Sequence, residues 1–260
     1  MRIKRIPFIE DRWSREKILS AEFFIGKTTL TMKLYIYALK TLLTSPTKDN
    51  FEQLKILLKI LPQYSMMSPE HILNLYNLIN DINVSGIEGD IVECGVWNGG
   101  SSAIMAFSNQ LHRTETSENR IFWLFDSFKG LPQPSEQDEA LSKINDWKGL
   151  YKGSVENVHN ICNKLNLDLD KVKIIEGWFD DTFRHVQIDK IALLHIESDL
   201  YNPIKLCLET FYDKVMLGGF IVCDDYCWKG GKKAIDEFVE KHMISIQLKN
   251  IKNVVYFQKT

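Results

Sequence analysis

Short apolar runs alternate with helix-like segments along the chain from residue 90 onward. Five of these runs have the length and residue types of β-strands: residues 90–94, 120–126, 171–176, 190–197 and 219–224. Strands separated by helices are typical of βαβ units, in which neighbouring strands run parallel. Ligands of such sheets bind beyond the carboxyl ends of the strands. The alternation therefore predicts an α/β fold with a binding site at that edge.

Two further apolar runs, residues 245–248 and 254–257, are close enough in the sequence to form an antiparallel hairpin at one sheet edge. The expected fold is α/β, with a doubly wound, mostly parallel sheet of seven strands. Residues 14–60 show helical spacing, so we expect a helical extension over residues 1–64 and a main domain over residues 65–260. That domain opens with a helix, because Ser68 and Pro69 are typical of a helix N-terminus.

Four acidic side chains follow the last two of the five parallel runs. Glu197 and Asp199 close one run, and Asp224 and Asp225 close the next. If the two strands are neighbours, the acids share one crevice, where like charges are costly unless a cation is bound. Oxygen ligands suit Mg²⁺ or a similar divalent cation. Strand-end acids can also be caps or ion-pair members, and the residues alone leave that alternative open.

A glycine-containing turn, Glu93-Cys-Gly-Val-Trp-Asn-Gly99, follows the first run. It lacks the Gly-x-Gly-x-x-Gly pattern of dinucleotide folds, and Glu93 would repel a pyrophosphate. This acid suits a cationic ligand such as the amino and sulfonium groups of S-adenosylmethionine. Asp126, at the end of the second run, is placed to accept hydrogen bonds from a ribose diol, which S-adenosylmethionine and NAD share.

The charges of the chain are balanced, with 32 basic and 34 acidic residues and a formal net charge of −2. Such a chain has no bulk attraction to nucleic acid or anionic membrane, so we expect neither as a partner. No stretch approaches 18 apolar residues and the start lacks an apolar signal-peptide core, so we expect a cytoplasmic protein. The five cysteines are scattered, and we expect reduced, mostly packed thiols.

A long, polar connection, residues 131–153, lies between the second and third runs. Loops of this kind often close over a ligand, and a plain surface insertion fits the composition equally well. Together with the N-terminal helices, this connection is expected to shape the pocket for a second substrate.

Five ordered motifs within residues 65–260 resemble those of the macrocin O-methyltransferase family. The resemblance implies a class I, Rossmann-like methyltransferase domain and a metal-dependent enzyme that methylates hydroxyls of sugars or other small molecules. The motifs are Gly89-Asp-Ile-Val-Glu-Cys-Gly-Val-Trp-Asn-Gly-Gly-Ser101, Phe125-Asp-Ser-Phe-Lys-Gly-Leu-Pro132, Glu176-Gly-Trp-Phe-Asp-Asp-Thr182, His195-Ile-Glu-Ser-Asp-Leu-Tyr201 and Gly218-Gly-Phe-Ile-Val-Cys-Asp-Asp-Tyr226.

The resemblance also implies roles for individual residues. Asp199 corresponds to the general base. One motif departs from the family pattern, because Glu197-Ser-Asp199 stands where Asp-Gly-Asp is usual, which makes the first acid one methylene longer. The implied metal ligands are Glu197, Asp224 and Asp225. The residues implied to surround S-adenosylmethionine are Glu93, Gly95, Ser101, Asp126, Ser127, Gly177 and Trp178.

The resemblance, with the residues that carry it, predicts a metal-dependent O-methyltransferase for a small-molecule hydroxyl, with a sugar as the default acceptor. Mg²⁺ would bind the acceptor oxygens and acidify the hydroxyl, and Asp199 would remove its proton before the oxygen attacks the methyl group. Two alternatives remain. One is an NAD-dependent sugar oxidoreductase, which the missing dinucleotide glycines disfavour, and the other is a non-catalytic binding protein on the same fold. We expect a homo-oligomer, because the N-terminal helices resemble packing or oligomer helices.

Overall fold

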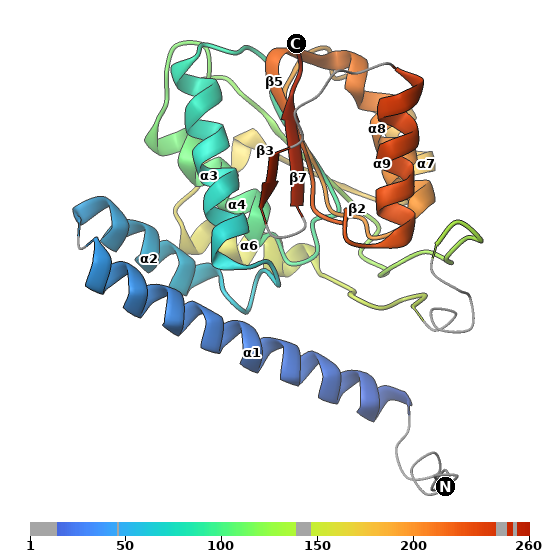
Figure 1. Ribbon diagram of the computed structural model, residues 1–260. Coiled ribbons are helices and arrows are strands. Elements are labelled where there is room, and N and C mark those ends of the chain that lie inside the picture. Colours follow the sequence, from blue (N-terminus) through green and yellow to red (C-terminus); the bar gives the residue numbers. More distant parts are fainter. Residues whose placement is uncertain (1–14, 46, 139–146, 243–248, 252–253) are drawn as a thin grey trace, which may run out of the picture.

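A mixed β-sheet forms the centre of the computed structural model, which describes residues 15–45, 47–138, 147–242, 249–251 and 254–260. Within these residues the sheet has seven strands in the order β3-β2-β1-β4-β5-β7-β6 (Figure 1). Strands β1 to β5 pair in parallel, and β7 pairs antiparallel with β5 and β6. The predicted, mostly parallel sheet is confirmed. The strands are β1 (Asp90–Cys94), β2 (Phe122–Asp126), β3 (Val172–Glu176), β4 (Ile191–Ile196), β5 (Val215–Cys223), β6 (Lys249–Ile251) and β7 (Val254–Gln258).

Helices cover both faces of the sheet (Figure 1). The strand order reverses beside β1, because the chain runs outward through β2 and β3 and then returns to place β4 on the other side of β1. This reversal opens a crevice at the carboxyl ends of β1 and β4. One face carries α3 (Pro69–Val84), α4 (Gly100–Leu111) and α6 (Val155–Lys164), and the other carries α7 (Phe179–Thr182), α8 (Tyr201–Phe211) and α9 (Lys229–Lys241). Short 3-10 turns are η1 (Leu169–Lys171), η2 (Phe183–His185) and η3 (Tyr212–Lys214).

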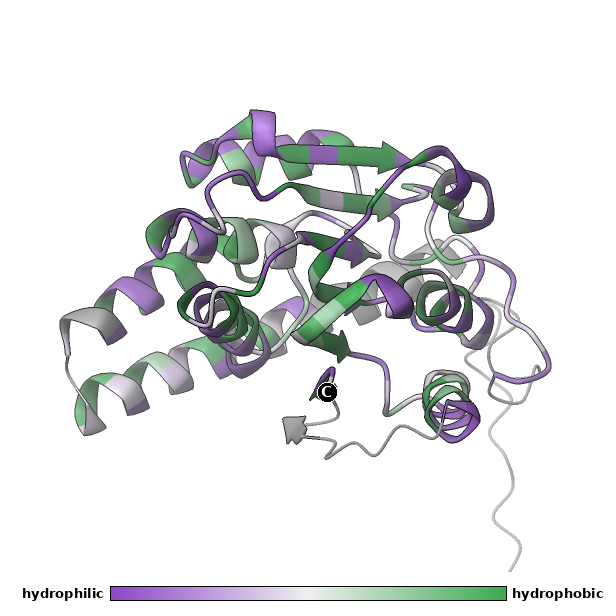
Figure 2. Ribbon diagram, turned by 90° about the horizontal axis from the view of Figure 1, so that it is seen from above, coloured by the Kyte–Doolittle hydropathy of each residue, from purple (hydrophilic) through white to green (hydrophobic). Residues whose placement is uncertain are grey.

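The hydrophobic core lies in two layers, one on each face of the sheet. Ile91 and Leu193 belong to the layer under α3 and α4, whereas Val92 and Leu194 belong to the layer under α8 and α9. Successive side chains of a strand point to opposite faces, so strands covered on both sides must be apolar throughout. Figure 2 shows hydrophobic residues concentrated along the sheet and hydrophilic residues on the outer surfaces of the helices.

Two predicted element boundaries can be compared with the structure. Helix α3 begins where Ser68 and Pro69 predict it, and the Ser68 hydroxyl accepts a hydrogen bond from the backbone N–H of His71 at 3.4 Å. The second strand of the predicted hairpin is β7. The first predicted strand, residues 245–248, lies outside the described residues, and β6 forms just after it.

Two helices precede α3, namely α1 (Arg15–Thr44) and α2 (Lys48–Ile60), as the helical spacing predicts. Leu30 and Leu34 of α1 are buried in the core. The opposite side of α1 exposes large apolar side chains, which we call the α1 stripe. Its members are each more than 60% exposed: Met32, Tyr35, Ile36, Leu39 and Leu43.

The structure also bears on two expectations drawn from composition. None of the helices among the described residues is long and apolar enough to cross a membrane. The five cysteines form no disulfide, and all except Cys227 are buried. The expectation of mostly packed thiols is confirmed for four of the five.

Candidate functional site

A cavity of about 640 Å³ opens at the carboxyl ends of the parallel strands. This volume is that of a site for small molecules. Three of the predicted site residues, Glu93, Gly177 and Asp224, lie beside or beneath the cavity wall. The others form part of the wall: Gly95, Ser101, Asp126, Ser127, Trp178, Glu197, Asp199 and Asp225. The fold thus brings all five motifs to one place.

The turn after β1 passes directly against the end of β4. Gly95 has φ +93°, and a Cβ at this position would overlap the carbonyl oxygen of Glu197. Only glycine accommodates both the positive φ and the close approach. The predicted cofactor turn and the first of the clustered acids are therefore in backbone contact.

Asp126, at the end of β2, holds the turn after β1. Its Oδ2 accepts hydrogen bonds from the N–H groups of Val96 and Trp97, both at 2.8 Å, and its Oδ1 accepts from Phe128 at 2.7 Å. Burial raises the pKa of Asp126, and the three hydrogen bonds oppose that rise. A carboxylate has about four acceptor positions, so about one remains for a ligand.

The other residues predicted to contact the cofactor lie around the same part of the wall. Ser101 is in the first turn of α4, and Ser127 follows β2. Gly177 has φ +146°, and a Cβ there would lie 2.7 Å from the Thr182 methyl group. This glycine therefore permits the turn that brings Trp178 to the cavity.

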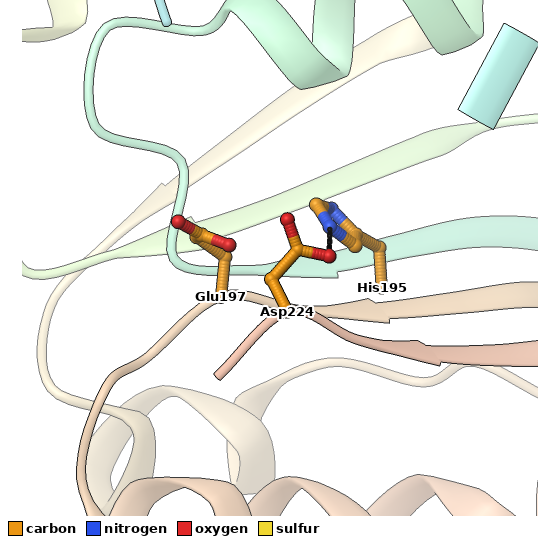
Figure 3. A group of neighbouring side chains, drawn as sticks. All are labelled: His195, Glu197 and Asp224. Carbon is orange, nitrogen blue, oxygen red and sulfur yellow. Dashed lines mark hydrogen bonds and ion pairs between the residues drawn. The ribbon is translucent and has the colours of Figure 1, made fainter. Parts of the chain in front are cut away.

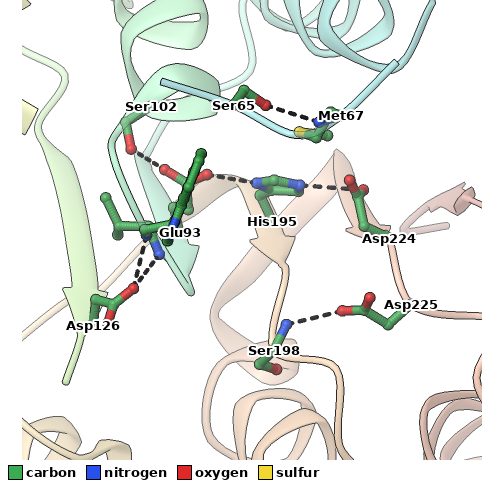
Figure 4. A network of polar contacts seen from close by, with 11 residues as sticks. Ser65, Met67, Glu93, Ser102, Asp126, His195, Ser198, Asp224 and Asp225 are labelled. Carbon is green, nitrogen blue, oxygen red and sulfur yellow. Dashed lines mark hydrogen bonds and ion pairs between the residues drawn. The ribbon is translucent and has the colours of Figure 1, made fainter. Parts of the chain in front are cut away.

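A buried chain of polar contacts runs beneath the cavity (Figure 4). The Ser102 hydroxyl donates to Glu93, and Oε1 of Glu93 lies 2.9 Å from Nδ1 of His195. On the other side of the ring, Nε2 of His195 lies 3.2 Å from Oδ1 of Asp224. Glu93 and His195 meet because they are register partners in β1 and β4. The fully buried Glu93 carboxylate is engaged within the protein, and its predicted contact with a cofactor stays a prediction.

The charges along this row of buried hydrogen bonds stabilise one another. Burial alone would lower the pKa of His195, but the Asp224 and Glu93 carboxylates outweigh that effect and raise it to about 10. Burial likewise opposes ionisation of Asp224, yet His195 brings the pKa of Asp224 below its ordinary value. The raised pKa favours the imidazolium form of His195, which can donate to a carboxylate on each side.

The acids at the ends of β4 and β5 form a compact group. One ligand atom each from His195, Glu197 and Asp224 lie within 4.8 Å of one another (Figure 3). Burial raises the pKa of Glu197 and of Asp225, and repulsion from neighbouring acids raises both further. Among the described residues, Oε2 of Glu197 is buried without a hydrogen-bond partner. An oxygen-rich group of buried acids that repel one another when ionised has the donor chemistry of a hard-cation site.

Asp199 lies in the turn that follows β4. Oδ2 of Asp225 accepts a hydrogen bond from the N–H group of Ser198 at 2.9 Å (Figure 4). The same oxygen accepts from the N–H group of Asp199 at 2.8 Å. Asp199 has φ +58°, a conformation that non-glycine residues adopt only where surrounding contacts impose it. Burial raises the pKa of Asp199 to about 6. The turn thus presents a carboxylate of raised proton affinity to the cavity.

Sequence reasoning missed three residues that the structure places at the site. They are Ser102 and His195 in the buried chain and Asp138 in the cavity wall. For His195 a signal was present, because side chains two apart on a strand share a face and His195 lies two residues before Glu197. Asp138 carries no such signal, since its position depends on the path of an irregular connection.

Comparisons with known proteins agree with this geometry. The family model described as Macrocin-O-methyltransferase (TylF) matches residues 35–259. The chain is 30% identical over 202 residues to demethyldecarbamoylnovobiocin O-methyltransferase of Streptomyces niveus, with 76% of each protein covered. It is 27% identical over 204 residues to mycinamicin III 3''-O-methyltransferase of Micromonospora griseorubida, covering 76% of this chain and 79% of that protein. The structure of the O-methyltransferase NovP superposes with a TM-score of 0.67 at 28% identity, covering 90% of this chain and 99% of NovP.

The doubly wound sheet, the glycine turn and the cavity at the crevice between β1 and β4 are those of an S-adenosylmethionine-dependent O-methyltransferase. Within that class, the chain belongs to the macrocin-O-methyltransferase family. The resemblance drawn from the five motifs is confirmed. The family match begins at residue 35, inside α1, and so includes helical sequence that precedes the motifs.

Proposed function

We propose that this enzyme is metal-dependent and transfers a methyl group from S-adenosylmethionine to a hydroxyl of a sugar or a similar secondary metabolite. One observation carries the proposal: Glu197 and Asp225 face the same cavity as Asp199, beside the glycine turn. The names of the relatives support the acceptor class, because they are O-methyltransferases of novobiocin and mycinamicin intermediates.

We assign the cofactor to the wall formed by the ends of β1, β2 and β3. Gly95 lets the turn after β1 pass against the end of β4, and Asp126 retains an acceptor position for a ribose hydroxyl. Glu93 supports this wall from beneath through Ser102. The remaining members of the assignment are Ser101, Ser127, Gly177 and Trp178.

We assign a divalent cation, such as Mg²⁺, to Glu197, Asp224 and Asp225. The residues fit such an ion, because the group gathers buried acids of raised proton affinity and leaves Oε2 of Glu197 without a partner. When bound, a divalent cation compensates this charge and acidifies a hydroxyl beside it. His195 orients Asp224 within the group by hydrogen bonding to its Oδ1.

The chain's own contribution to the reaction is proton removal and alignment. Asp199 takes the proton of the acceptor hydroxyl while the oxygen forms a bond to the methyl carbon and the bond from that carbon to the cofactor sulfur breaks. Asp225 holds the turn that aims Asp199, through the two backbone N–H groups at 2.8 and 2.9 Å. Holding both reactants in line supplies much of the rate enhancement in such a transfer.

The acceptor is assigned to the side of the cavity between α7 and α9. Trp228 lines the cavity with 39% of its surface exposed, and its ring meets Trp147 edge to face at 5.2 Å. Pro203, Leu206 and Phe179 add apolar surface on that side. An amphipathic wall of this kind suits a glycosylated small molecule with apolar ring faces.

The N-terminal helices complete the proposal. We assign residues 1–64 to a helical extension and residues 65–260 to the methyltransferase domain, and we assign the α1 stripe to contact with a second copy of the chain. A stripe exposed along one side of a helix is self-complementary when two copies pack antiparallel. Exposed apolar groups of this extent are typical of interfaces.

Titration calorimetry tests the cofactor and the metal separately. S-adenosylmethionine and S-adenosylhomocysteine are expected to bind, NAD is not, and Mg²⁺ binding is expected to disappear in Glu197→Gln. Glu176→Gln is the matched control, because Glu176 also ends a strand but lies away from the acid group. Binding of NAD alone would favour the oxidoreductase alternative.

Turnover tests the reaction class. With mycinamicin III and demethyldecarbamoylnovobiocin as probe acceptors, a chelator should abolish S-adenosylhomocysteine formation and added Mg²⁺ should restore it. Methylation that resists chelation would remove the metal from the proposal. Cofactor binding without turnover on a wider panel of sugar-bearing acceptors would favour a non-catalytic binding protein.

A further inference from the structure

Asp138 joins three separate segments of the chain at the edge of the cavity. Its side chain is only 3% exposed and lines the cavity wall. Oδ1 accepts a hydrogen bond from the backbone N–H of Tyr201 at 2.8 Å. Oδ2 accepts from the N–H of Ser135 at 2.7 Å and from its hydroxyl at 2.8 Å. All of these donors are strong partners for a buried carboxylate.

The hydrogen bond from Tyr201 gives an acceptor to the first backbone N–H group of helix α8. Tyr201 is the first residue of α8, and the preceding residue, Leu200, offers no side chain that could cap the helix. The first N–H groups of a helix lack partners within it, and a negative charge near them is stabilising. Asp138 therefore acts as a cap supplied from 63 residues away in the sequence.

The capped helix end belongs to the same turn as Asp199. Asp225 binds the N–H groups of Ser198 and Asp199, and Asp138 binds that of Tyr201 two residues later. Two buried carboxylates thus hold this short turn from both sides. The left-handed conformation of Asp199 is less favourable than the α or β region, and these hydrogen bonds help to hold it.

Helix α9 packs closely against Asp138. A Cβ at Gly230 would overlap Oδ1 of Asp138 and lie 3.1 Å from the Tyr201 nitrogen. Nearby, Lys233 of α9 donates to the Gln137 side chain. Gln137 and Asp138 therefore contact the first turns of both α8 and α9.

We infer that Asp138 is a positioning residue, which ties the acceptor side of the cavity to the turn that carries Asp199. The inference rests on the proposed function only in giving Asp199 the role of base. The tie itself is a set of contacts that exists whatever Asp199 does. Its effect on catalysis would pass through the turn, without contact between Asp138 and the reacting atoms.

NMR hydrogen exchange on the full chain tests the tie, which is the hydrogen bond from the Tyr201 N–H to Asp138, without an acceptor. Protein labelled with ¹⁵N-tyrosine gives signals from nine tyrosines, and hydrogen exchange is followed at the Tyr201 amide. In Asp138→Ala this amide should exchange about five- to thirtyfold faster, the loss expected on removing a helix cap. In Asp138→Asn the single amide oxygen can still accept from Tyr201, but the NH2 group then faces the donors of Ser135, so protection should lie between that of Asp138→Ala and that of wild type.

Gly230→Ala probes the same contact from the other helix. It should release the Tyr201 amide as Asp138→Ala does, because the new methyl group displaces Oδ1. The same methyl group would also lie 3.1 Å from the Tyr201 nitrogen, so the result for Gly230→Ala is interpreted only together with that for Asp138→Ala. Ser135→Ala is the matched control, because it removes one donor to Oδ2 and leaves Oδ1 and Tyr201 in place.

The outcomes separate this inference from the proposed function. Unchanged Tyr201 exchange in Asp138→Ala would overturn the tie even if Asp199→Asn is inactive. Loss of Tyr201 protection together with normal turnover by Asp199→Asn would keep the tie and remove Asp199 as the base. A thermal unfolding curve for each variant shows whether it is folded. If Asp138→Ala is unfolded, Tyr201 exchange is compared between Asp138→Asn and wild type instead.

Discussion

Nε2 of His195 lies 3.2 Å from Oδ1 of Asp224 in the protein interior, where the His195 side chain has no exposure and that of Asp224 only 6%. The imidazolium also faces Glu93 at 2.9 Å, so one buried cation is shared by two buried carboxylates. A charge arrangement of this kind is self-consistent only while all three members are present. It connects the strand that precedes the cofactor turn to the acids at the end of β5.

Replacing the charged His195 side chain should therefore destabilise the fold. We expect His195→Gln to lower the free energy of unfolding by about 3 to 5 kcal/mol, because the substitution leaves buried carboxylates without their partner. Urea unfolding measures the effect. His159→Gln, on the exposed side of α6, should change stability by less than about 0.5 kcal/mol. Equal midpoints for the two variants would show that His195 is not a charged partner of the acids.

The proposed base gives a sharp kinetic expectation. Asp199→Asn should reduce turnover of any accepted substrate at least about a hundredfold, the usual contribution of a general base. S-adenosylhomocysteine binding should be nearly unchanged, as measured by calorimetry. Asp180→Asn is a fair control, because Asp180 also lines the cavity but is exposed and outside the acid group. Normal methylation by Asp199→Asn would exclude the assigned role.

The glycine turn allows a test of backbone geometry. Gly95→Ala should abolish S-adenosylhomocysteine binding and destabilise the fold, since the new methyl group would overlap the Glu197 carbonyl oxygen. Gly86→Ala also replaces a glycine of positive φ, but no atom lies within 4 Å of the added Cβ. It should cost only about 1 to 2 kcal/mol of stability and leave binding intact. Similar behaviour of the two variants would contradict a steric role for Gly95.

The α1 stripe predicts the behaviour of the chain in solution. Ile36→Glu should reduce the molar mass measured by light scattering to that of a single chain, because it places a charge in the centre of the apolar contact. Lys33→Glu, which alters charge beside the stripe, should preserve the wild-type mass. A wild-type protein that is already monomeric at micromolar concentration would remove the stripe as a self-association surface.

Sequence reasoning reached the features that depend on local chemistry. The parallel sheet follows from apolar runs separated by helical segments, and the start of α3 follows from Ser68 and Pro69. The acids at strand ends could be grouped because parallel strands end at one edge of a sheet. These inferences need only neighbouring residues and the periods of strands and helices.

Pairing between distant side chains could not be predicted in the same way. Glu93 meets His195 through the register of β1 against β4, and Asp138 meets Tyr201 through the path of a connection that has no regular period. Likewise, the exposure of the α1 stripe depends on which side of α1 packs against the core.

By itself the sequence determined the fold class, the glycine turn and the set of acids that meet at the cavity, because strand periodicity and turn chemistry are local properties. The tertiary structure alone decided that Glu93 faces His195, that Asp138 caps α8 and that Asp199 is held at a positive φ. Those relationships depend on register and on irregular backbone, which bring together residues that no short-range pattern connects.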